Sequence, residues 1–227
     1  MTPDAISAAE VSKGVEAFNS VYGEMDKALW RISQAARDGL LGRQESPAVG
    51  TLVWTIKSWW GVQGVRREVA QITAQALLAE EWTGELFEAV LASGPDAERF
   101  ACLRVSRLVD EMVARGAGRR EFSFASKTLH WLMPWRVPVY DSFVRKSVGV
   151  PTTWGHEDAY RQIVSRQLVA AEALVTGPTG WAGDVEPKSP LRALDKYLWW
   201  VGGGSTSQAT LVKDPWSVVY RLGLRPE

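Results

Sequence analysis

Apolar residues recur at helical spacing along nearly the whole chain of 227 residues. The pattern is clearest over 5–38 and 96–114, where apolar side chains return every three or four positions. It therefore predicts a mainly α fold. In these two segments the side chains expected to be buried are Val15, Phe18, Val21, Tyr22, Met25, Leu29 and Ile32, and Phe100, Leu103, Val105, Leu108, Val109, Met112 and Val113.

Glycine and proline residues divide this pattern into shorter elements. Further helices are expected over 64–81, 84–92, Ser123–Met133, Ser142–Val148, Gly155–Val175 and Pro190–Val201. A loop is expected over 176–190, and short strands are expected only over 49–56 and 215–220. We therefore expect one helical domain over 1–227.

Cysteine and histidine are too scarce for most metal chemistry. Cys102 is the only cysteine, which excludes an intrachain disulfide, a Cys-based zinc site and an iron–sulfur cluster held by four thiolates. With two histidines, His130 and His156, only a histidine–carboxylate site stays open, and no cofactor is expected. Neither a signal peptide nor a membrane-spanning apolar run is visible. We expect a cytoplasmic protein of bacterial type with no membrane partner.

Charge is balanced overall and concentrated locally. Basic and acidic residues number 26 each, which excludes a protein that coats nucleic acid through bulk charge. Within residues 99–146, however, ten basic residues accompany four acidic ones, a net charge of +6. This segment is a candidate anion-binding face. The alternative is that its arginines are solvated or pair with acidic residues of the N-terminal helix.

Tryptophan is enriched, with twelve residues in the chain. Most of these rings are expected to be buried, because large aromatic side chains dominate protein cores. The other interpretation is that some of them form stacking surfaces for a planar ligand.

The stretch Ser123–Ser142 carries the densest chemistry. Lys127 lies in an apolar helix, where burial disfavours the ammonium form and favours the nucleophilic amine. Pro138 stiffens the approach to Asp141, which lies at the N-cap position of the next helix. Two helices joined in this way could present an amine and a carboxylate across a cleft. The alternative is a surface lysine and an ordinary helix cap.

Ser126-Lys127 in an apolar helix, followed by Val137-Pro138-Val139-Tyr140-Asp141-Ser142, resembles the helix-hairpin-helix superfamily of DNA glycosylases. The resemblance is closest to the 8-oxoguanine DNA glycosylase-like branch, and Leu191–Trp199 resembles the C-terminal helix of its small prokaryotic members. It implies a helix-hairpin-helix glycosylase-like fold, with two packed helical subdomains around a cleft: about 1–95 with 176–227, and 96–175. It also implies that Lys127 attacks the sugar C1′, displaces the base and leaves an imine, while Asp141 stabilises the positive charge on the sugar.

The resemblance further implies a double-stranded DNA partner whose target base is flipped out of the stack. The family's Gly-x-Gly before the Ser-Lys pair is here Phe122-Ser123-Phe124-Ala125, so other groups are expected to contact phosphates. The residues expected to bind DNA are Ser123, Ser126, Arg119, Arg120, Arg145 and Lys146.

Base recognition is expected from aromatic side chains and one acid. The candidates are Trp131, Asp195, Trp199 and Trp200. A core position is the alternative for each tryptophan, and an ion pair with Arg192 or Lys196 is the alternative for Asp195.

The sequence thus predicts a monomeric DNA glycosylase, with or without an AP-lyase step, that excises a damaged or modified base. Oxidised guanine is the family default, and a bulky modified phage base is equally open. Genome repair and phage defence are therefore both open. The alternatives are a non-catalytic helix-hairpin-helix-like DNA-binding protein and a helical interaction or toxin–antitoxin-type protein.

Overall fold

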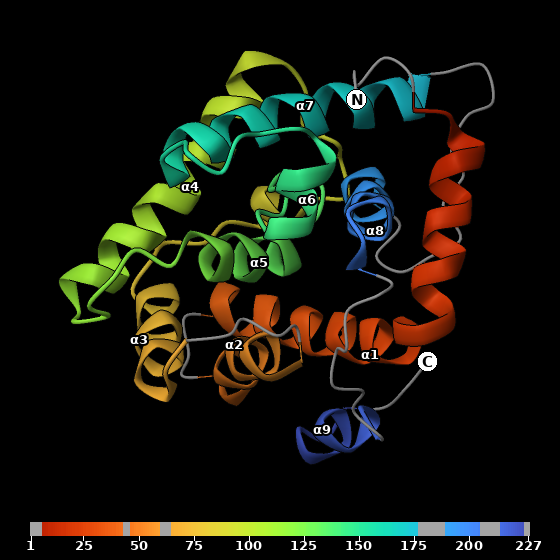
Figure 1. Ribbon diagram of the computed structural model, residues 1–227. Coiled ribbons are helices and arrows are strands. Elements are labelled where there is room, and N and C mark those ends of the chain that lie inside the picture. The colour runs from red at the N-terminus through yellow and green to blue at the C-terminus, as the bar shows by residue number, and fades with distance from the viewer. Residues whose placement is uncertain (1–5, 43–45, 60–64, 177–188, 205–213, 225–227) are drawn as a thin grey trace. The chain divides into compact units, whose positions relative to one another are not determined.

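The computed structural model describes residues 6–42, 46–59, 65–176, 189–204 and 214–224. Over these residues the regular structure is helical, with no β-strand, which confirms the mainly α prediction (Figure 1). The elements are α1 (Ala8–Leu41), α2 (Pro47–Trp59), α3 (Arg67–Leu78), the 3-10 helix η2 (Gly84–Phe87), α4 (Gly94–Ala114), α5 (Phe122–Leu132), α6 (Ser142–Ser147), α7 (His156–Thr176), α8 (Pro190–Val201) and α9 (Trp216–Arg221).

The chain divides into two compact units. Unit 1 comprises 1–21, 89–104 and 134–208, and unit 2 comprises 22–88, 105–133 and 209–227. The N-terminal parts of α1 and α4 belong to unit 1, and their C-terminal parts belong to unit 2. These bounds differ from those of the expected subdomains, whose packing around a cleft stays a prediction.

Unit 1 is organised around α8, against which α6 and α7 pack. Every side chain of α8 from Pro190 to Leu198 is buried. The helix starts as predicted, with Pro190 in its first turn. Ser189 caps it by accepting the backbone N–H of Arg192, and donates its own hydroxyl to the carbonyl of Pro134. These bonds fasten α8 to the segment that leads to Asp141.

In unit 2, α2 packs against α3 and α5. The predicted strand over 49–56 is wrong, because these residues lie in α2. The buried side chains of that stretch include Val49, Leu52, Val53 and Ile56, which recur at helical rather than alternating spacing. That spacing prevails over the β-branched composition of the run.

The predicted strand over 215–220 is also wrong, because α9 covers nearly all of it. Asp214, which precedes the N-cap residue Pro215, accepts the backbone N–H of Ser217 in the first turn of this helix. The helix expected over 84–92 is wrong in extent, since only η2 forms there. Three residues placed in buried stripes are exposed, because they lie off the buried faces of α1 and α4: Val21, Leu103 and Val113. Residues 177–188 of the expected loop lie outside the described residues.

Candidate active site

Helix α5 leaves only one of its faces incompletely buried. Nine of its eleven side chains are buried, and the two half-buried ones are Ser123 and Lys127. Residues four positions apart lie on the same face of a helix. The predicted nucleophile and a predicted phosphate contact therefore share the one face of α5 that a ligand can approach.

The C-terminal end of α5 is fastened to α1 inside unit 2. The carbonyl of Trp131, near the helix end, accepts hydrogen bonds from Ser33 Oγ and from the Arg37 guanidinium. Arg37 also lies 4.2 Å from the centre of the Trp30 ring. Burial lowers the pKa of Arg37 to about 10, so this side chain stays charged at neutral pH. α5 is thus held firmly, and Lys127 projects from a rigid element.

The connection between α4 and α5 is a tight loop that the sequence analysis did not identify as part of the hairpin. Gly116 and Gly118 have φ angles of 95° and 83°, a region that favours glycine. The N–H of Ala117, between them, donates to the carbonyl of Met112. The signal was present as Gly-Ala-Gly between two amphipathic segments. The result is a helix–loop–helix hairpin with Lys127 on its second helix.

Asp141 lies at the N-cap of α6, as predicted. Its Oδ1 accepts the backbone N–H of Val144 at 2.8 Å. The preceding segment 134–140 is not helical: residues 134–136 form a turn, and 137–140 have no regular structure. All of its side chains except that of Arg136 are buried. Pro138 and its buried neighbours therefore present a half-buried carboxylate from a stiff segment, as expected.

Lys127 belongs to unit 2 and Asp141 to unit 1. Next to Asp141, the hydroxyl of Tyr140 lies 2.9 Å from Arg145 Nη1 and 2.8 Å from His156 Nδ1. Burial raises the pKa of Tyr140 despite the neighbouring Arg145. This network braces the start of α6 against the start of α7.

Arg145 is a structural residue in this conformation. Its side chain is buried, and besides Tyr140 it donates to the carbonyls of Val150, Pro151 and Trp154. Its donors are therefore directed inward, away from any phosphate. Lys146, the next residue, is exposed.

The other predicted DNA contacts lie at the hairpin of unit 2. Arg119 and Arg120 are exposed and form ion pairs with Glu121 and Asp110, respectively. Ser126 is buried and donates to the carbonyl of Ser123. Both acids lie within residues 99–146 and are already counted in the net charge of +6, and neither belongs to the N-terminal helix that the alternative interpretation named. Ion pairs near the protein surface are weak enough to exchange for a phosphate.

The four candidates for base recognition differ in accessibility. Trp131 is buried, and Asp195 is buried in an ion pair with Arg192, as its alternative interpretation anticipated. Trp199 is half-buried and packs edge-on against Phe18 and Phe143, with ring centres 5.4 and 5.9 Å away. Trp200 is 37% exposed. Only the last two have surface that a ligand can reach without repacking.

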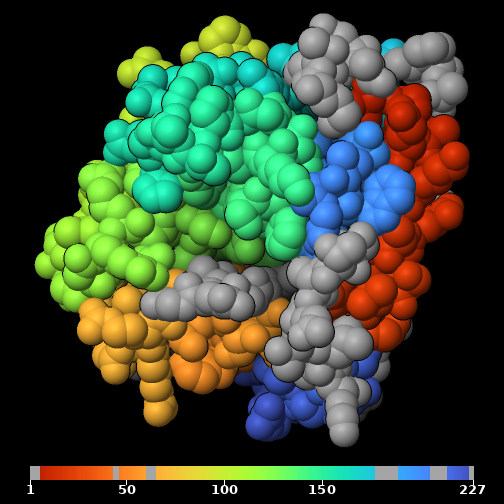
Figure 2. Space-filling view, in the orientation of Figure 1, coloured from red at the N-terminus to blue at the C-terminus, as the bar shows by residue number. Residues whose placement is uncertain are grey.

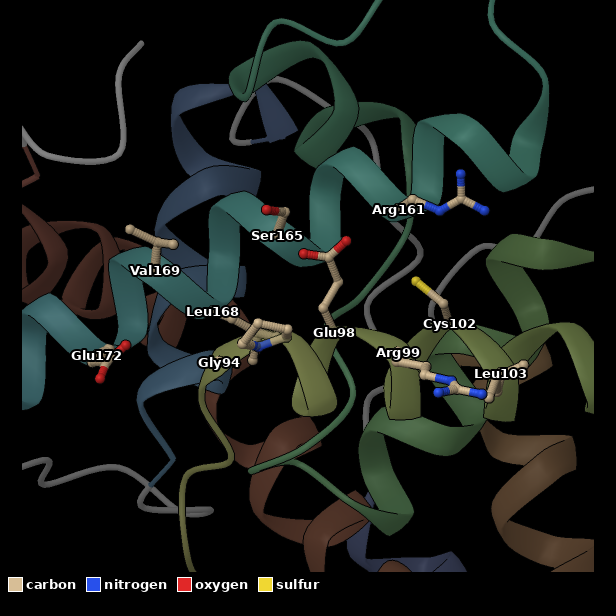
Figure 3. A pocket seen from close by; sticks show the side chains of 11 residues that line it. Gly94, Glu98, Arg99, Cys102, Leu103, Arg161, Ser165, Leu168, Val169 and Glu172 are labelled. Carbon is tan, nitrogen blue, oxygen red and sulfur yellow. The ribbon is translucent and has the colours of Figure 1, made fainter.

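Unit 1 also contains a groove of about 480 Å³ between α4 and α7 (Figure 3). The carboxylate of Glu98 points toward α7 near Ser165, and the Cys102 thiol also points toward α7. None of the predicted site residues lines it. Its lining residues are Gly94, Pro95, Glu98, Arg99, Cys102, Leu103, Arg161, Ser165, Leu168, Val169 and Glu172.

The Cys102 thiol in this groove is expected to be unreactive near neutral pH. Burial, reinforced by Glu98, raises its pKa to about 11. At pH 8 about one thiol in 10³ is then the reactive thiolate, and alkylation by iodoacetamide should accelerate about tenfold per pH unit up to that pKa. Protein unfolded in urea, with the same single cysteine, is the control. Equal rates for folded and unfolded protein at pH 8 would contradict this expectation.

Among the described residues, no helix is long and apolar enough to cross a membrane, and no group of three or more His, Cys, Asp or Glu side chains is arranged to hold a metal ion. Neither a protein-family model, nor a curated protein, nor a solved structure matches this chain.

Proposed function

We propose that this chain is a DNA glycosylase that excises a damaged or modified base, with Lys127 as nucleophile and Asp141 as the stabilising carboxylate. The observation that carries the proposal is the local order of elements. A helical hairpin leaves Lys127 on the one accessible face of α5, and a buried non-helical segment then leads to Asp141 at the N-cap of α6. This order is what the resemblance to helix-hairpin-helix glycosylases implies for these residues.

In the proposed reaction the amine of Lys127 attacks C1′ of a flipped nucleotide. The N–C1′ bond forms as the glycosidic bond breaks, and the departing base takes up one of the two protons of the amine. The C1′–O4′ bond then opens, O4′ takes up the other proton, and an imine joins Lys127 to the sugar. The carboxylate of Asp141 stabilises the positive charge that develops on the sugar in the transition state.

The proposed partner is double-stranded DNA, bound by a monomer in the cytoplasm. Phosphate contacts are assigned to the hairpin, through the loop of Gly116 and Gly118 and through Arg119, Arg120 and Ser123, and to Lys146. A phosphate can approach the backbone of such a loop closely because glycine carries no side chain. Base stacking is assigned to Trp199 and Trp200. Ser126, Arg145, Trp131 and Asp195 take no part, because they are buried inside unit 1 or unit 2.

The experiment is a panel of duplexes that each carry one modified base, incubated with the chain in the presence of borohydride. Reduction of the imine should link the chain covalently to the duplex that holds its substrate, and excision should be measurable on that duplex alone. Salt-dependent DNA binding without trapping or excision on any duplex would favour the non-catalytic DNA-binding protein. Absence of DNA binding as well would favour the helical interaction protein.

A further inference from the structure

Trp54 is an exposed aromatic side chain on the surface of unit 2. Its exposed fraction is 44%, although the hydrophobic effect favours burial of so large a ring. The other exposed residues of α2 are Pro47, Gly50 and Ser58, and a Cβ atom at Gly50 would meet nothing within 4 Å. Small side chains on both sides along the helix therefore leave the indole ring accessible to a flat ligand.

Two cations accompany this ring. Lys57 Nζ lies 5.0 Å from the Trp54 ring centre, and the Arg67 guanidinium carbon, from the first turn of α3, lies 5.7 Å from it. Contacts of this kind between exposed groups are weak, and both side chains are long enough to move aside. The sequence from Pro47 to Arg67 holds three basic residues and no acidic one, and the nearest acid on α3 is Glu68. The charged groups recorded at the Trp54 ring, Lys57 and Arg67, are therefore both positive.

This surface is continuous with the hairpin loop. The guanidinium of Arg66 contacts the carbonyl of Ala117 at 3.5 Å, and its Nη2 lies 3.4 Å from the position that a Cβ atom of Gly118 would occupy. Arg66 thus joins the start of α3 to the loop that precedes α5. Figure 2 shows the orange and amber atoms of α2 and α3 at the molecular surface. Trp54 consequently extends the face to which the proposed function assigns phosphate contacts.

We propose that Trp54, Lys57 and Arg67 form a second nucleic-acid contact, in which an unpaired base stacks on the indole ring and the two cations contact the phosphates on either side of it. This inference rests on the proposed function only for the choice of DNA as partner. Aromatic rings bind unpaired bases of any sequence by stacking, and adjacent cations add a salt-dependent contribution. The contact is therefore indifferent to sequence and selective for DNA that is single-stranded or locally unpaired.

A membrane surface is the competing partner for an exposed tryptophan between cations. Interfacial helices, however, bury a stripe of several large apolar side chains among the lipids. On α2 the exposed neighbours of Trp54 are proline, glycine and serine, so no such stripe exists there. A single ring with flanking positive charge fits one stacked base better.

The test compares equilibrium binding of the full chain to a labelled single strand, to a duplex with one bulged nucleotide and to the fully paired duplex. Trp54→Ala should weaken binding to the first two about tenfold and affect the paired duplex far less, because it removes one stacking contact. Trp54→Phe should restore most of the affinity. Lys57→Ala and Arg67→Ala should each lower the slope of log affinity against log salt by about 1.

The matched control is Trp154→Ala, which removes another exposed tryptophan, from unit 1, and should leave binding unchanged. Equal affinities for wild type and Trp54→Ala, or equal losses for both variants, would overturn the inference. The inference would also be overturned if Trp54→Ala lost the wild-type binding to anionic phospholipid vesicles while its binding to DNA stayed intact. These binding measurements need no catalysis. If Trp54→Ala weakens DNA binding but the wild type excises no base, only the proposed function fails. If the wild type excises a base but Trp54→Ala binds DNA normally, only this inference fails.

Discussion

Replacing Lys127 with glutamine is expected to abolish borohydride trapping and to lower base excision by about 10³-fold or more, because the proposed reaction forms its covalent link to C1′ through this amine. Glutamine preserves most of the length and polarity of the side chain but has no basic amine. Lys127 is half-buried on a helix whose core contacts come from its other faces, so the variant should fold normally. The measurements are single-turnover excision and covalent trapping on the same substrate duplex.

Lys13→Gln is the matched control, since Lys13 is an exposed lysine on α1 outside the proposed machinery. It should trap and excise at the wild-type rate. DNA binding by Lys127→Gln should also persist, which separates loss of chemistry from loss of the complex. Normal trapping and excision by Lys127→Gln would remove Lys127 from the reaction and leave the hairpin as a DNA-binding element only.

Periodicity and backbone restriction made much of the fold predictable. The long helices α1, α4 and α7 follow from apolar spacing, and the connection from Pro134 to the cap at Asp141 follows from two prolines and an N-capping side chain. The same reasoning failed over 49–56, where a short, continuous apolar run is compatible with either a buried strand or a buried helix. Only the contacts of α2 with α3 and α5 decide between the two.

The candidate site was less predictable because residue type does not reveal which partner a side chain finds. Arg145 is of a residue type that commonly binds phosphate, yet four oxygen atoms within its own unit accept its hydrogen bonds. Asp195 is of a residue type that can accept a hydrogen bond from a base, yet it forms an ion pair with Arg192, three positions away on the same buried helix face. Gly116 and Gly118 precede the Ser126-Lys127 pair by several residues, and their function in the hairpin depends on backbone conformation, which residue type and order do not reveal.

Asp141→Asn is expected to reduce single-turnover excision by about 100-fold while leaving stability nearly unchanged. The amide oxygen of asparagine can still accept the backbone N–H of Val144, so the helix cap survives at a cost of a few tenths of a kcal/mol at most. The negative charge does not survive, and it is this charge that would stabilise the positive sugar in the transition state. The measurements are excision rate and melting temperature on the same variant.

Two further variants separate capping from catalysis. Asp141→Ala removes the cap as well and should lower stability by about 1 kcal/mol beyond the asparagine variant, with no further large loss of rate. Asp96→Asn neutralises an exposed acid in the first turn of α4 and should change neither quantity appreciably. If Asp141→Asn excises at the wild-type rate, Asp141 is only a helix cap. Of the two catalytic residues that the resemblance implies, only Lys127 would then remain, and the proposed reaction would need another group to stabilise the sugar cation.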